Sequence, residues 1–201
     1  RYFINKALGG IHLFRPEVMV AIPAGINSTE RRAVIDATIA AGARAAYLIK
    51  APLVAAIGAD IPIGAASGHM VIDIGAGTAE IAVISLGGIV SWGSVRIGGN
   101  KFDQSISDFV RRKYNLEVGV HTAQEIKINV GSAMYIAKPL TTDIKGRDLI
   151  TGLPRIVTVS SDDVTEALQH DLNLLMNAIK EVLHKTPPEL SADVMDKGII
   201  L

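Results

Sequence analysis

The segment Asp73–Thr78, with the sequence DIGAGT, constrains the fold of this chain more than any other segment. It separates two β-branched runs, Met70–Ile74 and Glu80–Ser85, so the pattern predicts a strand, a tight turn and a second strand. Closely spaced glycines allow successive backbone N–H groups to converge on an anion. A dinucleotide-binding loop of the Rossmann type would lead into a helix and would carry Gly-x-Gly-x-x-Gly. Position 80 is Glu, so that class of site is excluded.

The residues around the turn allow two interpretations. For a Gly-x-Gly alone, an ordinary hairpin turn is the commoner explanation. However, Asp73 ends the first strand, and a carboxylate there can hold Mg²⁺ through water together with phosphate oxygens. A third strand, Ile89–Arg96, extends the pair into an antiparallel meander. No Walker A sequence occurs, and a strand, phosphate loop and strand in succession indicate the actin-like ATPases.

Alternating strand and helix signals precede the meander. Strands are predicted at Glu17–Ile22 and Tyr47–Ile49, and Asn27 with Glu30 has capping-box spacing at the start of the helix between them. This order predicts a parallel strand pair covered by helices. Residues 60–68, rich in Pro and Gly, form the best linker.

Apolar periodicity predicts helices and edge strands after the meander. The helices are expected at 102–114, 123–133 and 160–182, and two edge strands are expected within 136–159. Ser160 and Asp163 have the spacing of a cap for the last helix, and Pro187-Pro188 closes it. The chain is therefore expected to have an α/β fold.

Composition excludes several classes of function. The 201 residues include 20 Lys and Arg and 20 Asp and Glu, and this zero net charge argues against general nucleic-acid binding. The chain has no Cys, which excludes disulfides, thiol nucleophiles and Cys-based zinc sites. It has no apolar run of spanning length and no signal segment, so we expect a cytoplasmic protein. The start at Arg1 and the apolar last residues indicate a piece of something longer.

Other candidate groups are weaker. The five His residues never pair at metal-ligand spacing, and Arg111-Arg112-Lys113 is typical of a solvated helix face. Leu13 and Phe14 form an apolar pair in a loop where polar residues are expected. Such a pair either packs into the core or inserts into a membrane or a partner surface.

Several stretches together resemble the MreB family, bacterial actin homologues that form membrane-bound filaments and govern rod cell shape. The stretches are Asn5–Pro16, Pro23–Arg32, Met70–Leu86, Ser94–Phe102, Thr122–Ser132 and Thr186–Leu201. The resemblance implies an actin-like ATPase fold (ribonuclease-H-like), with two related domains and a nucleotide cleft, incomplete in this chain. It implies the following division: residues 1–60 are part of domain IA, 61–100 and 160–201 form domain IIA, and 101–159 form domain IIB.

The resemblance also implies ATP and Mg²⁺ as cofactors and assigns residues to them. The second phosphate loop of the family is matched by Gly75, Ala76, Gly77 and Thr78, with Ala76 where a third glycine is common. Asp73 is matched to Mg²⁺ bound through water. The helix segment that meets adenosine is matched by Gln124, Glu125, Ile126 and Lys127, with Glu125 and Lys127 as its polar contacts. Leu13 and Phe14 match the loop that inserts into the membrane.

Two departures from the family pattern bear on activity. The first phosphate loop of the family would lie before residue 1 and its glycine-rich adenosine segment after Leu201, so these residues hold only part of an ATP site. Ala51 stands where relatives have a glutamate that positions the attacking water, and alanine has no acceptor for this role. No catalytic residue is therefore assigned, and ATP hydrolysis is left open.

The function implied by the resemblance is that of an ATP-binding, filament-forming protein that helps determine cell shape from the inner face of the membrane. Its implied partners are copies of itself, the membrane surface, and proteins of cell-wall synthesis and cell shape, with no nucleic acid. One alternative is a scaffold with the nucleotide fold but without ATPase activity. Another is a sugar kinase or a chaperone-type ATPase of the same superfamily.

Overall fold

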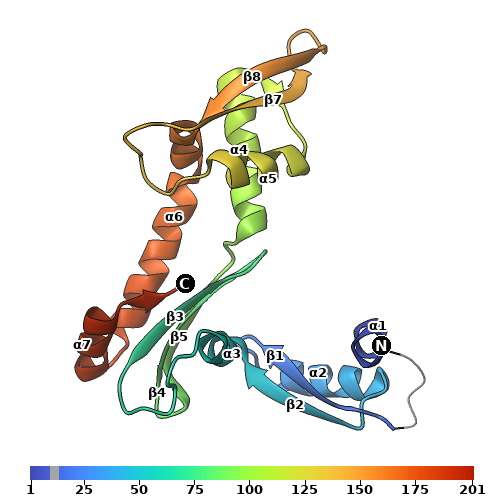
Figure 1. Cartoon of the computed structure of the whole chain (residues 1–201), viewed down its shortest axis with the longest axis vertical. Helices are drawn as coiled ribbons and strands as arrows, with labels where there is room; N and C mark the ends of the chain where they lie inside the picture. Colours follow the sequence, from blue (N-terminus) through green and yellow to red (C-terminus); the bar gives the residue numbers. More distant parts are fainter. Residues whose placement is uncertain (10–13) are drawn as a thin grey trace. The chain divides into compact units, whose positions relative to one another are not determined.

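The computed structural model describes residues 1–9 and 14–201, which form two compact α/β units (Figure 1). The first unit comprises Arg1–Asp73, Glu80–Ser94 and Glu181–Leu201, and the second comprises Ile74–Ala79 and Val95–Lys180. The α/β class predicted from the sequence is confirmed. The division of the chain into family domains remains a prediction.

The first unit opens with a parallel strand pair and its helices. Its elements are α1 (Tyr2–Leu8), β1 (Glu17–Ile22), α2 (Ser28–Ala40), β2 (Ala45–Lys50) and α3 (Ala51–Gly58). β1 and β2 pair in parallel, as the alternating order predicts, and the register places Ile22 opposite Lys50. The predicted capping box is also confirmed: the Asn27 side chain accepts the Glu30 N–H at 2.8 Å, and the Glu30 carboxylate accepts the Asn27 N–H at 3.0 Å.

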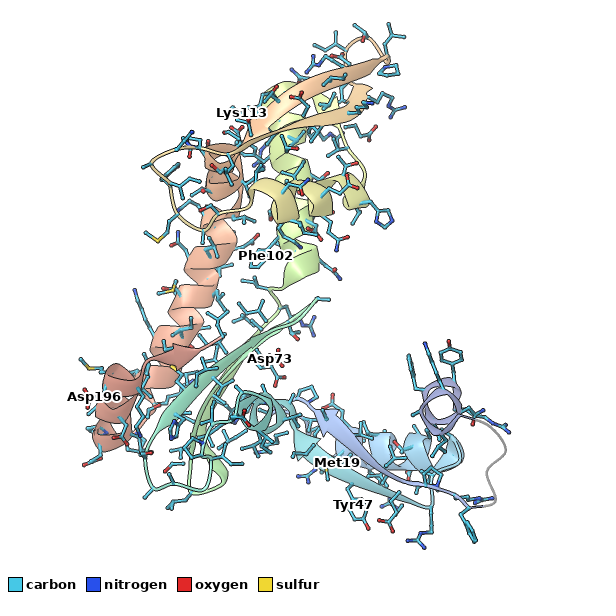
Figure 2. The ribbon with its side chains drawn as sticks, in the orientation of Figure 1. Met19, Tyr47, Asp73, Phe102, Lys113 and Asp196 are labelled. Atoms are coloured by element: carbon cyan, nitrogen blue, oxygen red, sulfur yellow. The ribbon has the colours of Figure 1, made fainter. Side chains whose placement is uncertain are left out.

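The exposed side of the β1–β2 pair is apolar at its centre. Met19 and Tyr47 are register partners on the two strands, and they are 66% and 50% exposed (Figure 2). Parallel strands are usually covered on both faces, so the described residues leave part of this small sheet uncovered.

A four-stranded sheet completes the first unit. It contains β3 (His69–Ile74), β4 (Ala79–Ser85), β5 (Gly88–Val95) and β9 (Ile199–Ile200), in the order β5-β4-β3-β9. The links between β3, β4 and β5 are too short for a crossover, so these neighbours run antiparallel and the predicted meander is confirmed. Every residue of β4 is buried. Val71 and Ile84 of this sheet pack with Ala56 of α3 and Ile61 in one core cluster.

The second unit is built on two helices, a hairpin and most of a long helix. Its elements are α4 (Gly99–Tyr114), β6 (Leu116–Glu117), α5 (Val120–Val130), β7 (Thr141–Asp148), β8 (Pro154–Ser160) and α6 (Ser161–His184), which extends to the boundary at Lys180 and beyond. The three strands form an antiparallel sheet in the order β6-β7-β8, and the core between sheet and helices includes Ile106, Ile126 and Val159. The predicted cap of α6 is confirmed, since the Asp163 carboxylate accepts the Ser160 N–H at 2.8 Å.

The structure corrects two sequence predictions. The helix predicted over 123–133 ends at Val130, because Gly131 leaves helical geometry with a ψ of 132°. A Cβ at position 131 would lie 2.1 Å from the Lys127 carbonyl oxygen, so this backbone conformation requires glycine. Ala133 therefore lies outside α5. Pro187-Pro188 does end α6, but Pro188 also begins α7 (Pro188–Lys197), a helix that the sequence reading missed.

In the part of the chain that the structure describes, every helix is too short or too polar to cross a bilayer.

Candidate functional site

The loop Gly75–Thr78 is hydrogen-bonded to the first residues of α4, and both segments lie in the second unit. The Gly75 N–H donates to the Thr78 carbonyl oxygen at 2.8 Å, which closes the turn. The Gly99 N–H donates to the Gly75 carbonyl at 3.0 Å, and the Asn100 N–H donates to the Ala76 carbonyl at 2.8 Å. Two loop carbonyls are thus occupied by the first N–H groups of α4, which a helix leaves without internal partners.

The N–H groups of the same loop remain available. Among residues 1–9 and 14–201, the N–H groups of Ala76, Gly77 and Thr78 have no protein acceptor, and all three residues are exposed. Three successive amides on a closed turn are able to bind an anion, with the loop carbonyls tied back to α4. This arrangement fits the predicted phosphate loop, and the phosphate-binding role itself remains a prediction.

Packing of the loop against α4 requires glycine at position 98, which lies outside the loop itself. Ala76 does not adopt a positive φ, so its methyl group causes no backbone strain. A Cβ on Gly77 would meet no atom within 4 Å, whereas a Cβ on Gly98 would lie 2.5 Å from the Gly75 carbonyl oxygen. Gly98 therefore permits the close approach of α4 to the loop. Sequence reasoning missed this role, although the pair Gly98-Gly99 directly before a helix was the available signal.

Lys127 connects α5 to the same support. Its ammonium group donates to the Gly99 carbonyl at 3.1 Å and forms an ion pair with Asp103 at 2.7 Å. Asp103 is only 4% exposed, and a buried carboxylate needs an opposite charge beside it. Lys127 supplies that charge within the second unit. The ion pair fixes Lys127 beside the first turn of α4.

The other residues matched to the adenosine helix face different surroundings. Ile126 is fully buried in the core, and Gln124 is exposed. Glu125 lines a cavity of about 230 Å³ between α5 and β7, together with Thr142 and Lys145. Glu125 and Lys127 therefore lie on different sides of the helix, as expected for residues two positions apart.

Two carboxylates lie near the turn between β3 and β4: Asp73 is close to the end of β3 (Figure 2), and Glu80 is close to the start of β4. Asp73 is exposed, and Glu80 is only 7% exposed and accepts the Ala24 N–H at 3.2 Å. Burial raises the pKa of Glu80, and the negative charge of Asp73 adds to this increase, while the hydrogen bond from Ala24 opposes it. Among the described residues no three His, Asp or Glu gather into a metal site. A single accessible carboxylate at Asp73 fits Mg²⁺ that is held through water and phosphate.

Ala51 is the first residue of α3, and Lys50 is the N-cap and makes no side-chain capping bond. Neither an alanine methyl nor an ammonium accepts a hydrogen bond from water. The start of α3 therefore offers no side-chain acceptor at these two positions.

Of the apolar pair Leu13 and Phe14, the structure describes only Phe14. Leu13 lies outside the described residues. Phe14 is 84% exposed, so its side chain is not part of the core.

Comparisons with known proteins show which family this chain resembles. The family model described as "MreB/Mbl protein" matches residues 1–201. The cell shape-determining protein Mbl of Bacillus cereus is 43% identical over 201 residues, covering 100% of this chain and 60% of its own length. The cell shape-determining protein MreB of Escherichia coli K12 is 44% identical over 186 residues, covering 92% of this chain and 54% of its own.

A solved structure shares the fold. The structure of MreB5 of Spiroplasma citri bound to AMPPNP has a TM-score of 0.91 and 33% identity, and the match covers 97% of this chain and 59% of that one. The predicted actin-like fold is confirmed, and it is incomplete in these residues. The chain spans about 60% of the length of the Mbl relative.

Proposed function

Because this chain belongs to the MreB/Mbl family, we propose that it is part of an ATP-binding, filament-forming cytoskeletal protein that helps to determine bacterial cell shape. The two relatives described above are cell shape-determining proteins by name, and the related MreB5 structure is bound to the ATP analogue AMPPNP. Since the chain covers about 60% of such a relative, the activity of the whole protein belongs to the proposal.

The observation that carries nucleotide binding is the loop Gly75–Thr78 braced on α4. The free N–H groups of Ala76, Gly77 and Thr78 would bind phosphate oxygens, and Gly98 lets α4 hold the loop in place. Asp73 would hold Mg²⁺ through water, and the ion would neutralise charge on the phosphates. The chain's own residues thereby supply one phosphate-binding surface of an ATP site.

The helix α5 would supply the contact with adenosine. Lys127 has the strongest support, because its ammonium lies 3.1 Å from the Gly99 carbonyl, directly beside the turn that holds the phosphate loop. Gln124 and Glu125 are exposed and free to contact a ligand, whereas buried Ile126 keeps the helix in place. The adenosine role of this segment follows from the resemblance to the family.

Position 51 favours binding without rapid hydrolysis. Ala51 and the neighbouring Lys50 offer no acceptor that could orient an attacking water. This observation supports the second candidate, a nucleotide-fold scaffold without ATPase activity. The two candidates differ in whether the complete protein releases phosphate from ATP.

Membrane attachment is proposed for the loop that carries Leu13 and Phe14. Phe14 is 84% exposed, and two such apolar side chains contribute about 3–5 kcal/mol when buried. This is marginal for one molecule, but a filament repeats the loop many times. The protein would then lie on the inner face of the membrane, near proteins of cell-wall synthesis and cell shape.

Liposome co-sedimentation of filaments tests the attachment. Leu13→Ser with Phe14→Ser should abolish co-sedimentation, while Met195→Ser, which changes an apolar side chain that is 86% exposed elsewhere, should not. Unchanged co-sedimentation of the double variant would reject this role for the loop.

Calorimetric titration of the complete protein with ATP tests the function itself. We expect saturable binding that needs Mg²⁺, and Asp73→Asn should weaken the dependence on Mg²⁺. Asp36→Asn is the matched control, because Asp36 is an exposed carboxylate on α2, paired with Arg32. If the complete protein does not bind ATP, the proposed nucleotide-binding function is wrong, and the remaining candidate is a scaffold that does not use nucleotide.

A further inference from the structure

A cavity of about 430 Å³ lies within the first unit, where β5 meets the loop that leads into α2. Its lining includes the apolar side chains of Pro23, Ile26 and Trp92 and the acidic side chains of Glu30 and Glu80. The described residues that line it include no Lys, Arg or His. Its volume falls within the range of small-molecule pockets, roughly 300–1,000 Å³.

Trp92 is held against one wall of the cavity by a glycine. A Cβ at position 25 would lie 2.3 Å and 2.5 Å from atoms of the Trp92 ring, so glycine is required for the ring to lie this close to the loop. Trp92 still remains 42% exposed. The face of an indole ring is electron-rich and attracts a cation that reaches it. The free surface of Trp92 therefore suits a positively charged ligand.

Glu80 contributes a nearly buried carboxylate to the same cavity. It is 7% exposed, and its Oε2 accepts the Ala24 N–H at 3.2 Å. Within residues 1–9 and 14–201, its Oε1 has no donor and its charge has no ion-pair partner. Burial raises the pKa of Glu80, and a cation bound beside the carboxylate would lower it again. A buried carboxylate is normally paired, so this one lacks a positive partner.

Glu30 adds a second negative charge to the lining. Its Oε2 accepts the Asn27 N–H in the capping box, and its Oε1 has no donor in the part of the chain that the structure describes. The hydroxyl group of Ser94 is a further acceptor on the cavity.

These groups exclude several kinds of occupant. Two carboxylates repel a phosphate or any other anion. They are too few to hold a metal ion with protein ligands alone. An uncharged apolar ligand would leave the free oxygen of Glu80 without a partner, which costs binding energy. A small organic cation with N–H donors remains.

We propose that this cavity binds the primary ammonium group of a small alkylamine. An ammonium group donates three N–H bonds in separate directions, which suits the free Oε1 atoms of Glu30 and Glu80 and the Ser94 hydroxyl. A planar guanidinium fits best on both oxygens of one carboxylate, and a backbone N–H already occupies one oxygen of each Glu. The alkyl chain would lie on the Trp92 ring. The cavity does not use the N–H groups of the loop Gly75–Thr78, so the proposal stands independently of ATP binding.

Ligand-detected NMR on the complete protein, without nucleotide, measures this binding. n-Butylamine is the probe, and n-butanol is the neutral ligand of the same length. We expect n-butylamine to bind with a dissociation constant on the order of 1 mM and n-butanol to bind at least about tenfold more weakly. n-Butylguanidine, which carries a planar cation on the same alkyl chain, should also bind more weakly than the amine.

Single substitutions separate the contributions to affinity. Glu80→Gln keeps an acceptor for the Ala24 N–H but removes the charge, and it should weaken n-butylamine binding at least about tenfold. Trp92→Leu should weaken it about two- to tenfold, because the cation loses the aromatic face. Glu189→Gln is the matched control and should leave the affinity unchanged. Glu189 is an exposed carboxylate on α7 in the same unit, outside the cavity.

A second readout reports whether the amine lies beside Trp92. Trp92 is the only Trp among the 201 residues, and the resonance that is lost in Trp92→Leu identifies its indole N–H in the complete protein. This resonance should shift with n-butylamine over the same concentrations and not with n-butanol. Circular dichroism confirms that each variant remains folded.

Four results would overturn the proposal. They are equal binding of the amine and the alcohol, equal affinity in Glu80→Gln and Glu189→Gln, tighter binding of n-butylguanidine, and an indole resonance that does not respond to the amine. A complete protein that does not bind n-butylamine would also overturn it, and would indicate that the rest of the chain fills the cavity.

Discussion

Replacing Gly98 by Ala should push the loop Gly75–Thr78 away from the start of α4. The new Cβ would lie 2.5 Å from the Gly75 carbonyl oxygen and 2.8 Å from the Ala76 carbonyl group, which are backbone atoms that cannot rotate away. The φ of Gly98 is −166°, an extended value that alanine adopts freely, so the effect is steric and not conformational. The loop and the first turn of α4 must then separate.

The size of the effect follows from the contacts that would be lost. Overpacking costs about 1–3 kcal/mol. Separation also breaks the bonds from the Gly99 and Asn100 N–H groups, each contributing about 0.5–1.5 kcal/mol. The local stability of this turn should therefore fall by about 2–6 kcal/mol. Hydrogen exchange of the Gly99 and Asn100 amides measures this loss, and we expect exchange to be at least about tenfold faster.

Gly77→Ala is the matched control for this experiment. A Cβ on Gly77 meets nothing within 4 Å, and its φ lies outside the left-handed region, so exchange should barely change. If Gly98→Ala and Gly77→Ala give the same exchange rates, the close approach of α4 does not hold the loop, and this account of the site is wrong.

Three further predictions concern ATP, hydrolysis and pH. Residues 1–201 alone should bind ATP weakly or not at all, because the resemblance matches them to only one of the family's two phosphate loops and not to its glycine-rich adenosine segment; a micromolar affinity by calorimetry would contradict this. In the complete protein, Ala51→Glu should raise phosphate release by about 10²–10⁴-fold, and equal rates would mean that another residue orients the water. Burial raises the pKa of Glu80 in the folded state above its value in the unfolded chain. The free energy of unfolding therefore falls as pH rises above about 4.3, because the unfolded chain loses this proton more readily. Glu80→Gln keeps an acceptor for the Ala24 N–H and should raise the melting temperature at pH 7 but not below pH ~4, and an equal gain at both values would exclude this cause.

The features that the sequence predicts well are encoded locally. The capping residues Asn27, Glu30 and Asp163 act within one helical turn, so their spacing was enough to place the starts of α2 and α6. The turn at Gly75–Thr78 and the antiparallel meander follow from short links between β-branched runs. The parallel pairing of β1 and β2 follows from the helix between them.

The features that the sequence reading missed depend on contacts between distant residues. β9 is only two residues long and forms because Met70 and Val71 offer a free edge. Gly98 is required because the loop at Gly75 lies against it, and the pair Gly98-Gly99 before the helix signals a special backbone position without revealing that contact. The opposite orientations of Glu125 and Lys127 could have been found, since residues two apart diverge by about 200° on a helix.

Electron microscopy of the complete protein with and without AMPPNP tests the central claim most directly, namely that these residues form the phosphate-binding part of a filament-forming, nucleotide-binding protein. We expect filaments with the nucleotide, few or none without it, and a loss of filaments in Gly98→Ala but not in Gly77→Ala. Filaments that form equally well without nucleotide and in both variants, or no filaments under any condition, would contradict the claim.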